Sequence, residues 1–159
     1  MKTAIVYDTS HGTTEKVANM IASFNSSIEI FNLKENKNVN MDEFDQVIIG
    51  GSIHVGKIRR RVKEFCLKNL DKLLQKRVGL YLCAMNEPEY ENELKLAFPE
   101  ELRNHAVIKK VVGGEFLFDR MNFLERFIVK KISGINETTS KLDEKGIMQI
   151  VDEMGLRSM

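Results

Sequence analysis

The sequence predicts an α/β fold built on a doubly wound parallel sheet of five strands. Two observations lead to this prediction: apolar, β-rich runs that are mostly continuous, and helical patterns of apolar residues that lie between them. Continuous runs are typical of strands buried on both faces, as in a parallel sheet covered by helices. Strands and helices that alternate along one chain imply right-handed crossovers, and such sheets bind ligands beyond the carboxyl ends of their strands.

Each predicted element rests on its own pattern. The strand-like runs are Thr3 to Tyr7, Ile28 to Leu33, Val47 to Gly51, Val78 to Cys83 and Val107 to Val112. Apolar residues three and four positions apart predict the helices. The clearest helical stripes are Val17, Met20, Ile21 and Phe24, then Val62, Phe65, Cys66, Leu70 and Leu73, then Ile147, Ile150, Val151 and Met154.

The composition fits one domain over residues 1–159. A chain of 159 residues, 43% of them hydrophobic, is large enough for one core. The 24 basic and 23 acidic side chains nearly cancel, which argues against a nucleic-acid binder, a polybasic membrane protein or an acidic tail. Cys66 and Cys83 lie far apart without metal-ligand spacing, so we expect buried thiols in a reducing cytoplasm. The sequence shows no signal-peptide pattern and no run long enough to span a membrane, so a cytoplasmic protein is expected.

A hydroxyl-rich loop follows the first predicted strand and leads into the first helix. It consists of Thr9, Ser10, His11, Gly12, Thr13 and Thr14. Free backbone N–H groups at a helix N-terminus attract anions, hydroxyls add donors, and a glycine lets the backbone turn closely. The loop lacks the Gly-Lys-Ser/Thr of a Walker loop and the G-x-G-x-x-G of a nicotinamide-binding fold, so a phosphomonoester such as that of FMN fits it best. The alternative is a Ser/Thr-rich helix cap.

Three loops carry a resemblance to the flavodoxin family. Thr9 to Thr14 resembles the flavodoxin phosphate loop, Gly50 to Gly56 resembles the end of the third flavodoxin strand with its loop, and Cys83 to Pro88 follows the fourth strand. This resemblance implies the strand order 2-1-3-4-5 and FMN as the cofactor. The residues that it assigns to the flavin ring are Ser52, Ile53, His54, Val55 and Gly56 on one side and Ala84, Met85 and Asn86 at the pyrimidine edge.

Two side chains in these loops have alternative interpretations. Many flavodoxins place Trp or Tyr against the ring, whereas this loop offers Ile53, His54 and Val55. Aliphatic cover would leave a ring face open to substrate, and His54 either contacts the flavin or substrate or is an ordinary exposed histidine. Asn86 either hydrogen-bonds the ring through its amide or forms a turn before Pro88. We nominate no catalytic side chain and no metal ligand.

Within the flavodoxin family, the chain resembles most closely the menaquinone-dependent protoporphyrinogen dehydrogenase branch. The matching motifs are Gly51 to Gly56, Lys63 to Phe65, and Glu125 to Lys130 running on to Ser133-Gly134. The last motif lies in residues 116–139, which we interpret as an insertion between the fifth strand and the last helix. The resemblance therefore extends over nearly the whole chain.

The insertion predicts an amphipathic basic helix. Its apolar face comprises Leu117, Met121, Leu124, Ile128 and Ile132, widened by Phe123 and Phe127, and its cations are Arg120, Arg126 and Lys130. Such a helix beside a flavin would hold an apolar, acidic ligand such as a porphyrin, or would touch the inner face of a membrane that contains quinone. The alternative is a helix that only packs onto the domain.

A second basic cluster follows the loop assigned to the flavin ring. It consists of Lys57, Arg59, Arg60, Arg61 and Lys63, with no acidic residue among them. Cations at the start of a helix oppose its macrodipole, which favours an anionic partner or ligand. A solvated face is the alternative.

These features favour an FMN-dependent oxidoreductase resembling protoporphyrinogen dehydrogenase, with a quinone or porphyrinogen-like substrate. A flavodoxin electron carrier that serves redox proteins is the alternative, since the cofactor supplies the electron chemistry in both. The nearly neutral charge, the basic cluster and the insertion argue against a carrier, because carriers of this family are usually acidic. A response-regulator receiver is excluded because the third strand ends in Gly50-Gly51, without a phosphoacceptor aspartate.

Overall fold

The computed structural model describes residues 1–54, 56–116, 120–133 and 138–157. Its strands are Thr3–Tyr7 (β1), Glu29–Asn32 (β2), Gln46–His54 (β3), Lys57–Ile58 (β4), Arg77–Cys83 (β5), Ile108–Val111 (β6), Glu115–Phe116 (β7) and Thr139–Ser140 (β8). The long strands form a parallel sheet in the order β2-β1-β3-β5-β6, with β4 paired to β3 alone. This confirms the predicted fold class and strand order, because β5 and β6 are the fourth and fifth long strands.

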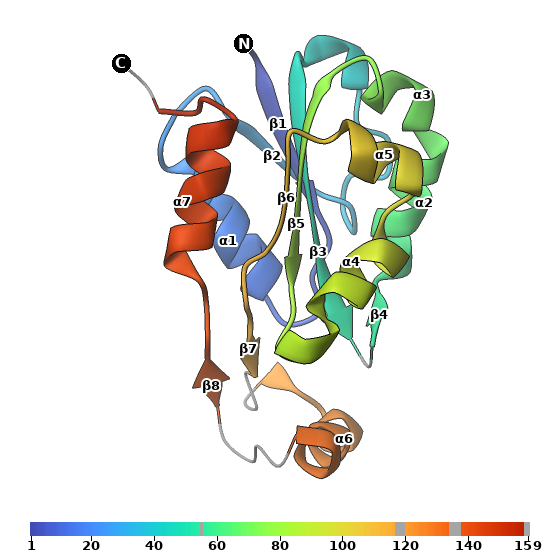
Figure 1. Cartoon of the computed structure of the whole chain (residues 1–159), viewed down its shortest axis with the longest axis vertical. Helices are drawn as coiled ribbons and strands as arrows, with labels where there is room; N and C mark the ends of the chain where they lie inside the picture. The colour runs from blue at the N-terminus through green and yellow to red at the C-terminus, as the bar shows by residue number, and fades with distance from the viewer. Residues whose placement is uncertain (55, 117–119, 134–137, 158–159) are drawn as a thin grey trace.

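Helices cover both faces of this sheet (Figure 1). The helices of the described residues are Thr13–Ala22 (α1), Arg60–Lys68 (α2), Leu70–Leu73 (α3), Tyr90–Ala97 (α4), Glu100–His105 (α5), Phe123–Ser133 (α6) and Glu144–Glu153 (α7), with 3-10 turns at Met41–Glu43 (η1) and Glu87–Glu89 (η2). Helices α1 and α7 lie on one face, and α2 to α5 lie on the other. The layers explain why the strands are apolar on both sides.

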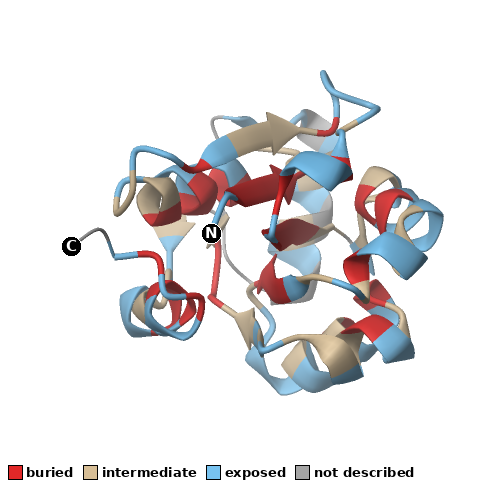
Figure 2. Ribbon diagram, turned by 90° about the horizontal axis from the view of Figure 1, so that it is seen from above, coloured by how far each residue is buried: buried red, intermediate tan, exposed pale blue. Residues whose placement is uncertain are grey.

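The core is divided by the sheet into two apolar clusters. Ile48 packs into the cluster beneath α1 and α7, whereas its neighbours Val47 and Ile49 pack into the cluster on the opposite face. Successive strand residues point to opposite faces, so a strand buried on both sides needs a continuous apolar run. Figure 2 shows these buried residues gathered in the centre of the molecule.

The strand register brings three distant loops to the same edge of the sheet. Tyr7 at the end of β1 pairs with Gly50 of β3, and Gly50 pairs with Tyr81 of β5. Ser52 then pairs with Cys83, the last residue of β5. Because the strands are parallel, the loops after β1, β3 and β5 all emerge at the carboxyl edge.

Three two-residue strands were not expected from the sequence. Strand β4 folds back on β3, with Ile53 paired to Ile58 and His54 to Lys57, and α2 consequently begins only at Arg60. Strands β7 and β8 pair with each other in a small antiparallel sheet. Such strands are too short to show a hydrophobic period, so sequence patterns do not detect them.

Helix α6 lies beyond the carboxyl edge of the main sheet, between β7 and β8 in the chain (Figure 1). Two residues of its predicted apolar face are exposed to solvent: 65% of Leu124 and 55% of Phe127 are accessible. Leu117 lies outside the described residues, as do the side chains of Phe123, Ile128 and Ile132. Within the described residues, no helix is long and apolar enough to cross a membrane.

Candidate functional site

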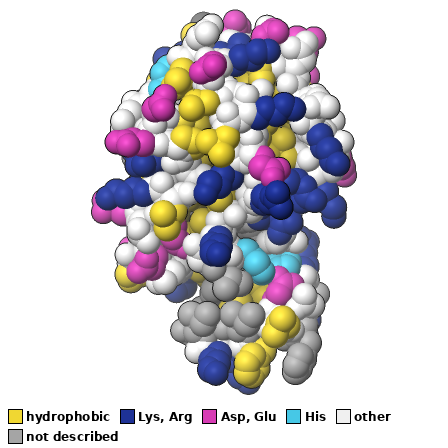
Figure 3. All heavy atoms as spheres, turned by 90° about the vertical axis from the view of Figure 1, so that its right-hand side faces the viewer, with side chains coloured by type: hydrophobic (Ala, Val, Ile, Leu, Met, Phe, Trp, Pro, Cys, Tyr) yellow, Lys and Arg dark blue, Asp and Glu magenta, His cyan; other side chains and the backbone are white. Residues whose placement is uncertain are grey.

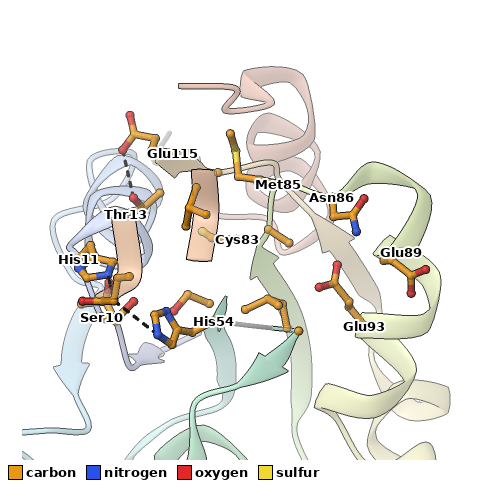
Figure 4. Close-up of a pocket in the computed structure, with 18 of the residues that line it drawn as sticks. Ser10, His11, Thr13, His54, Cys83, Met85, Asn86, Glu89, Glu93 and Glu115 are labelled. Carbon is orange, nitrogen blue, oxygen red and sulfur yellow. Dashed lines mark hydrogen bonds and ion pairs between the residues drawn. The ribbon is translucent and has the colours of Figure 1, made fainter. Parts of the chain in front are cut away.

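A pocket of about 410 Å³ lies at the carboxyl edge of the sheet (Figure 4). Its volume falls in the range of ordinary small-molecule sites. The lining residues come from the loops after β1, β3 and β5, from α4, from the start of β7 and from α6. They are Thr9, Ser10, His11, Thr13, Ser52, Ile53, His54, Gly56, Cys83, Ala84, Met85, Asn86, Glu89, Asn92, Glu93, Gly114, Glu115, Met121, Glu125 and Val129.

The loop after β1 leads into α1 next to this pocket, which Thr13 lines. Gly12 takes the N-cap position with φ 97°, a left-handed conformation that favours glycine, and as a glycine it offers the helix no side-chain cap. The Thr9 hydroxyl accepts a hydrogen bond from the Gly12 N–H at 2.9 Å, which tightens the loop. A helix N-terminus without a side-chain cap is suited to bind an anion.

Two cations from outside the loop lie next to it. Arg120 donates a hydrogen bond to the His11 carbonyl oxygen at 2.9 Å, and its guanidinium group lies directly over Gly12. Lys16 lies one turn into α1 and extends toward the same region. From the sequence, Arg120 was assigned to the basic face of the insertion and Lys16 was not singled out, so neither cation was expected beside this loop.

Glu115 of β7 places a carboxylate against the same helix start. Its Oε1 accepts from the Thr13 hydroxyl at 3.2 Å, and its Oε2 lies 3.0 Å from the Lys16 ammonium. Burial raises the pKa of this carboxyl, but hydrogen bonds from Lys16, Ser140 and Thr13 outweigh burial and lower it. The start of α1 therefore already stabilises one negative charge.

The loop after β3 contributes a buried polar atom that lacks a partner. Ser52 is 9% exposed, lines the pocket, and its hydroxyl makes no hydrogen bond to another described residue. Buried polar groups are usually satisfied, so an unpaired hydroxyl here indicates room for a ligand acceptor or donor. Ile53 and His54, which the flavodoxin resemblance assigns to the ring, follow it along the pocket wall.

The loop after β5 presents Ala84, Met85 and Asn86 to the pocket. The Tyr90 hydroxyl donates to the Ala84 carbonyl oxygen at 2.9 Å, which anchors this loop to α4. Asn86 is exposed and precedes the η2 turn, so it lies both at a turn and at the pocket. Burial raises the pKa of the Cys83 thiol to about 12, so this lining residue remains a neutral thiol.

Glu93 of α4 is a pocket residue that the sequence analysis did not single out. It is only 6% exposed, and its Oε1 has no hydrogen-bond partner among the described residues. Burial, and secondarily the charge of Glu89, raise the pKa of Glu93 above its ordinary value. A carboxyl group of this kind holds a proton more tightly than an exposed one. No motif marks it, because glutamate in the middle of a helix is common.

Two histidines from different loops meet on one carboxylate of α6. His11 Nε2 lies 2.7 Å from Glu125 Oε2, and His54 Nε2 lies 3.4 Å from the same oxygen. Burial raises the pKa of Glu125, but the Asn122 N–H, His11 and His54 together lower it. Glu125 opens one of the motifs that resemble the dehydrogenase branch, which is the only signal that the sequence offers for this contact.

The basic cluster Lys57 to Lys63 has a counter-ion within the chain. The sequence had suggested either an anionic partner or ligand, or a solvated face. Asp8 at the end of β1 is 1% exposed, and its Oδ2 lies 3.1 Å from Arg59 and 3.4 Å from Arg61. Arg60 pairs with Glu64 in the next turn of α2. Figure 3 shows Lys and Arg side chains gathered on this face above histidine side chains. Part of the cluster therefore neutralises a buried carboxylate.

The structure brings most of the predicted site residues to one place. The exceptions are Gly12 and Thr14, which do not line the pocket, and Val55, which lies outside the described residues. Gly12 shapes the loop beneath Arg120. Thr14 is fully buried, and its carbonyl oxygen accepts a hydrogen bond from the Tyr81 hydroxyl at 2.9 Å, so it joins the loop to β5.

Comparison with known proteins places this site in a family. Curated relatives include the protoporphyrinogen IX dehydrogenase [quinone] of Escherichia coli K12, which is 23% identical over 154 residues that cover 89% of this chain and 85% of the relative. Oxidised flavodoxin 1 from Bacillus cereus has the same fold, with a TM-score of 0.54 and 12% identity over 99% of this chain and all of the other. The rubredoxin oxygen:oxidoreductase of Desulfovibrio gigas gives a TM-score of 0.52 at 15% identity, and 96% of this chain matches about a third (36%) of that longer one. The family model of the flavodoxin domain matches residues 4–143, so this chain belongs to the flavodoxin domain family.

Proposed function

We propose that this chain binds FMN in the pocket at the carboxyl edge and works as a flavoprotein oxidoreductase. One observation carries the proposal: the side-chain-uncapped start of α1, the Ser52 loop and the Asn86 loop converge on a single pocket of about 410 Å³. Family membership supports it, since the flavodoxin domain is the family to which the chain belongs. We also propose that residues 1–159 form one domain in which residues 116–139 are an insertion.

The residues present fit FMN at both ends of the pocket. The N–H groups at the start of α1 and the loop hydroxyls would hold the phosphate, with Lys16 and Arg120 supplying positive charge nearby. At the other end, the unpaired Ser52 hydroxyl would serve the ring. Glu115 is the departure from a simple phosphate cradle, because it already accepts from Thr13. A phosphate would share or replace that contact.

Each part of the pocket would then contribute to binding the flavin or to its chemistry. FMN, when bound, supplies the exchange of one or two electrons with a donor or an acceptor. The loop Ser52 to His54 would orient the ring, and Asn86 offers an amide that can both donate and accept. Burial raises the pKa of Glu93, so this carboxyl would hold a proton more tightly than an exposed one. Met121, just before α6, and Glu125 and Val129 of α6 complete the pocket wall, which would limit the access of water to a bound flavin.

We further propose that the substrate is a quinone or a porphyrinogen-like molecule, as in the dehydrogenase to which the chain is similar. The exposed Leu124 and Phe127 on α6 support this choice, because they offer an apolar surface next to the pocket. Lys131 lies 5.8 Å from the centre of the Phe127 ring, so the same surface carries positive charge. Such a helix would suit contact with an anionic membrane surface that contains quinone, from the cytoplasmic side.

The alternative is an electron carrier that docks on acidic redox proteins. The exposed Arg60 beside Glu64 and the other cations of α2 favour this alternative, because charge complementarity guides such encounters. The two functions differ in the acceptor. An enzyme exchanges electrons fastest with a small quinone, and a carrier exchanges them fastest with a protein.

An absorption spectrum of the purified protein tests the cofactor. We expect a flavin spectrum and release of FMN on heating; release of FAD, or no flavin after reconstitution, would contradict the proposal. Stopped-flow mixing of the reduced protein with a menaquinone analogue or with a one-electron protein acceptor then separates the enzyme from the carrier. Faster recovery of the absorbance with the protein acceptor would favour the carrier.

The variant Gly12→Asp tests where the phosphate lies. It adds a negative charge and a side chain beside the proposed phosphate site, so FMN affinity should fall by tenfold or more, a loss of about 1.4 kcal/mol for each factor of ten. Gly155→Asp is the matched control, because Gly155 also has a positive φ but lies after α7. Equal FMN affinity in folded Gly12→Asp and native protein would move the phosphate elsewhere.

A further inference from the structure

His11, His54 and Glu125 form a compact group in the wall of the pocket. One ligand atom from each lies within 4.8 Å of the other two, and the two imidazole Nε2 atoms converge on the same carboxylate oxygen. Figure 4 shows both histidines at the wall formed by the loops after β1 and β3. The three residues are far apart in the chain, so only the fold brings them together.

The donor set matches a well-defined class of metal site. Two imidazole nitrogens and one carboxylate oxygen are ligands that zinc accepts, and sites with three protein ligands leave the fourth position to water or substrate. Bond lengths near 2 Å in a tetrahedral site separate neighbouring ligand atoms by roughly 3.3 Å. His54 already lies 3.4 Å from Glu125 Oε2, and His11, at 2.7 Å, would need to move away by about 0.6 Å. The three ligand atoms lie within 4.8 Å of one another, so the two imidazoles would also have to approach each other to about 3.3 Å when the metal binds.

The carboxylate is also held in a suitable orientation. Glu125 Oε1 accepts a hydrogen bond from the Asn122 N–H at 3.2 Å, and the Asn122 side chain accepts from the Glu125 N–H at 2.8 Å. This reciprocal pair fixes the start of α6 and leaves Oε2 directed at the histidines. Hydrogen bonds of this kind orient ligating groups in metal proteins and strengthen the site.

We propose that His11, His54 and Glu125 bind a divalent transition metal of the zinc class, with an open coordination position toward the pocket. All three residues line the pocket, so a water or a ligand atom in it could complete the coordination. The metal would join the loop after β1, the end of β3 and α6, and would thereby fasten α6 over the pocket. The proposal does not depend on the bound flavin, and it is tested on flavin-free and FMN-loaded protein alike.

A titration of tag-free protein with zinc, monitored by calorimetry, tests the proposal. We expect one zinc ion per chain and a melting temperature that rises with zinc. His11→Gln, His54→Gln and Glu125→Gln should each weaken zinc binding by about tenfold or more, because removal of a ligand should cost at least as much as removal of the groups that orient it. His105→Gln is the matched control: His105 is the third histidine, bonded to the Lys76 carbonyl oxygen away from the pocket.

A second readout identifies the ligands directly. With Cu²⁺ as the probe, electron paramagnetic resonance should show two imidazole nitrogens bound to the metal in native protein and in His105→Gln. It should show one in His11→Gln and one in His54→Gln. Absence of stoichiometric zinc binding, or equal affinity in native protein and all folded pocket variants, would overturn the proposal. An equal loss in His105→Gln would do the same. The three variants lie on different segments, so misfolding of one leaves two that decide the matter.

Discussion

The sheet body and the α6 region are held in place by different forces. In the body, Ile5, Ile48 and Leu80 are fully buried between the strands and the helices. Among the described side chains of residues 120–133, here called the α6 region, the contacts with the body include polar ones, such as that between Arg120 and the His11 carbonyl oxygen, and Leu124 is exposed. A buried leucine stabilises a fold by a few kcal/mol, whereas one hydrogen bond contributes about 1 kcal/mol net. Burial therefore dominates the stability of the body, whereas the described contacts of the α6 region with the body are individually weaker.

A leucine-to-alanine substitution in each region should give the largest difference in the free energy of unfolding. Leu80→Ala removes a fully buried side chain from β5 and should lower the free energy of unfolding by roughly 2–5 kcal/mol. Leu124→Ala removes a side chain that is 65% exposed and should change that free energy by less than about 0.5 kcal/mol. Urea unfolding of both variants measures the difference. Similar losses in the two variants would show that α6 packs as tightly as the body.

Loss of the buried ion pair at the edge of the body should have the next largest effect on the free energy of unfolding. Asp8→Asn removes the charge that faces Arg59 and Arg61 and should cost roughly 1.5–3 kcal/mol, the range for hydrogen bonds to charged groups, because Asp8 is 1% exposed. The lower part of that range is expected, since Arg61 reaches solvent. Denaturant unfolding measures the loss.

The exposed pair of Arg60 with Glu64 provides the control. Arg60 is 89% exposed in its side chain, and Arg60→Gln should change stability by less than about 1 kcal/mol. A larger effect of Arg60→Gln than of Asp8→Asn would contradict the assignment of Asp8 as the counter-ion of this cluster. It would also favour the alternative interpretation from the sequence, in which the cluster is a solvated face.

The body could be predicted from the sequence because its determinants are local. Continuous apolar runs such as that around Ile48 reveal strands, and a glycine among hydroxyl residues after the first run reveals the loop at Gly12. The register of parallel strands then brings the loops to one edge without further information. The assignment of Ser52 and Ala84 to the site came from the resemblance to the flavodoxin family, and the register places both at that edge.

The closing contacts could not be predicted because they join distant positions. His11 and Glu125 are 114 residues apart, and Arg59 is 51 residues from Asp8. Neither pair leaves a periodic pattern, and a single sequence shows no pairing between charges. Glu93 is invisible for a different reason: its unusual environment results from burial against the pocket, which no local residue signals.

Glu93, on the side of the pocket formed by the body, should make the stability of the protein depend on pH. Burial raises the pKa of this carboxyl, so the folded state holds its proton more tightly than the unfolded state does. Stability from this group is therefore present below the unfolded pKa, about 4.5, and is lost as pH rises through the folded pKa. Glu93→Gln, which cannot ionise, should melt at a higher temperature than native protein at pH 7.

The difference in melting temperature should shrink as the pH falls below about 4, where Glu93 is mostly protonated in both states. Glu91→Gln on the same helix is the control, because Glu91 is exposed and the variant should follow the native protein at each pH. Differential scanning calorimetry at several pH values measures both. A native protein more stable than Glu93→Gln at pH 7 would mean that the carboxylate finds a charged partner in the pocket.

The smallest effect on stability is expected for Phe127→Ser on α6. Phe127 is 55% exposed, and its main described contact is the cation–π contact with Lys131, worth about 0.5–1 kcal/mol at an exposed site. If α6 is the surface that meets quinone or a membrane, the variant should retain FMN and its melting temperature but exchange electrons more slowly with menaquinone in anionic vesicles. Leu96→Ser on α4 is the matched control, because Leu96 is 64% exposed and outside the pocket lining. Stopped-flow rates for both variants, alongside melting curves, decide the point: a slower rate in Phe127→Ser alone supports the enzyme, and equal rates in both variants and the native protein favour the electron carrier.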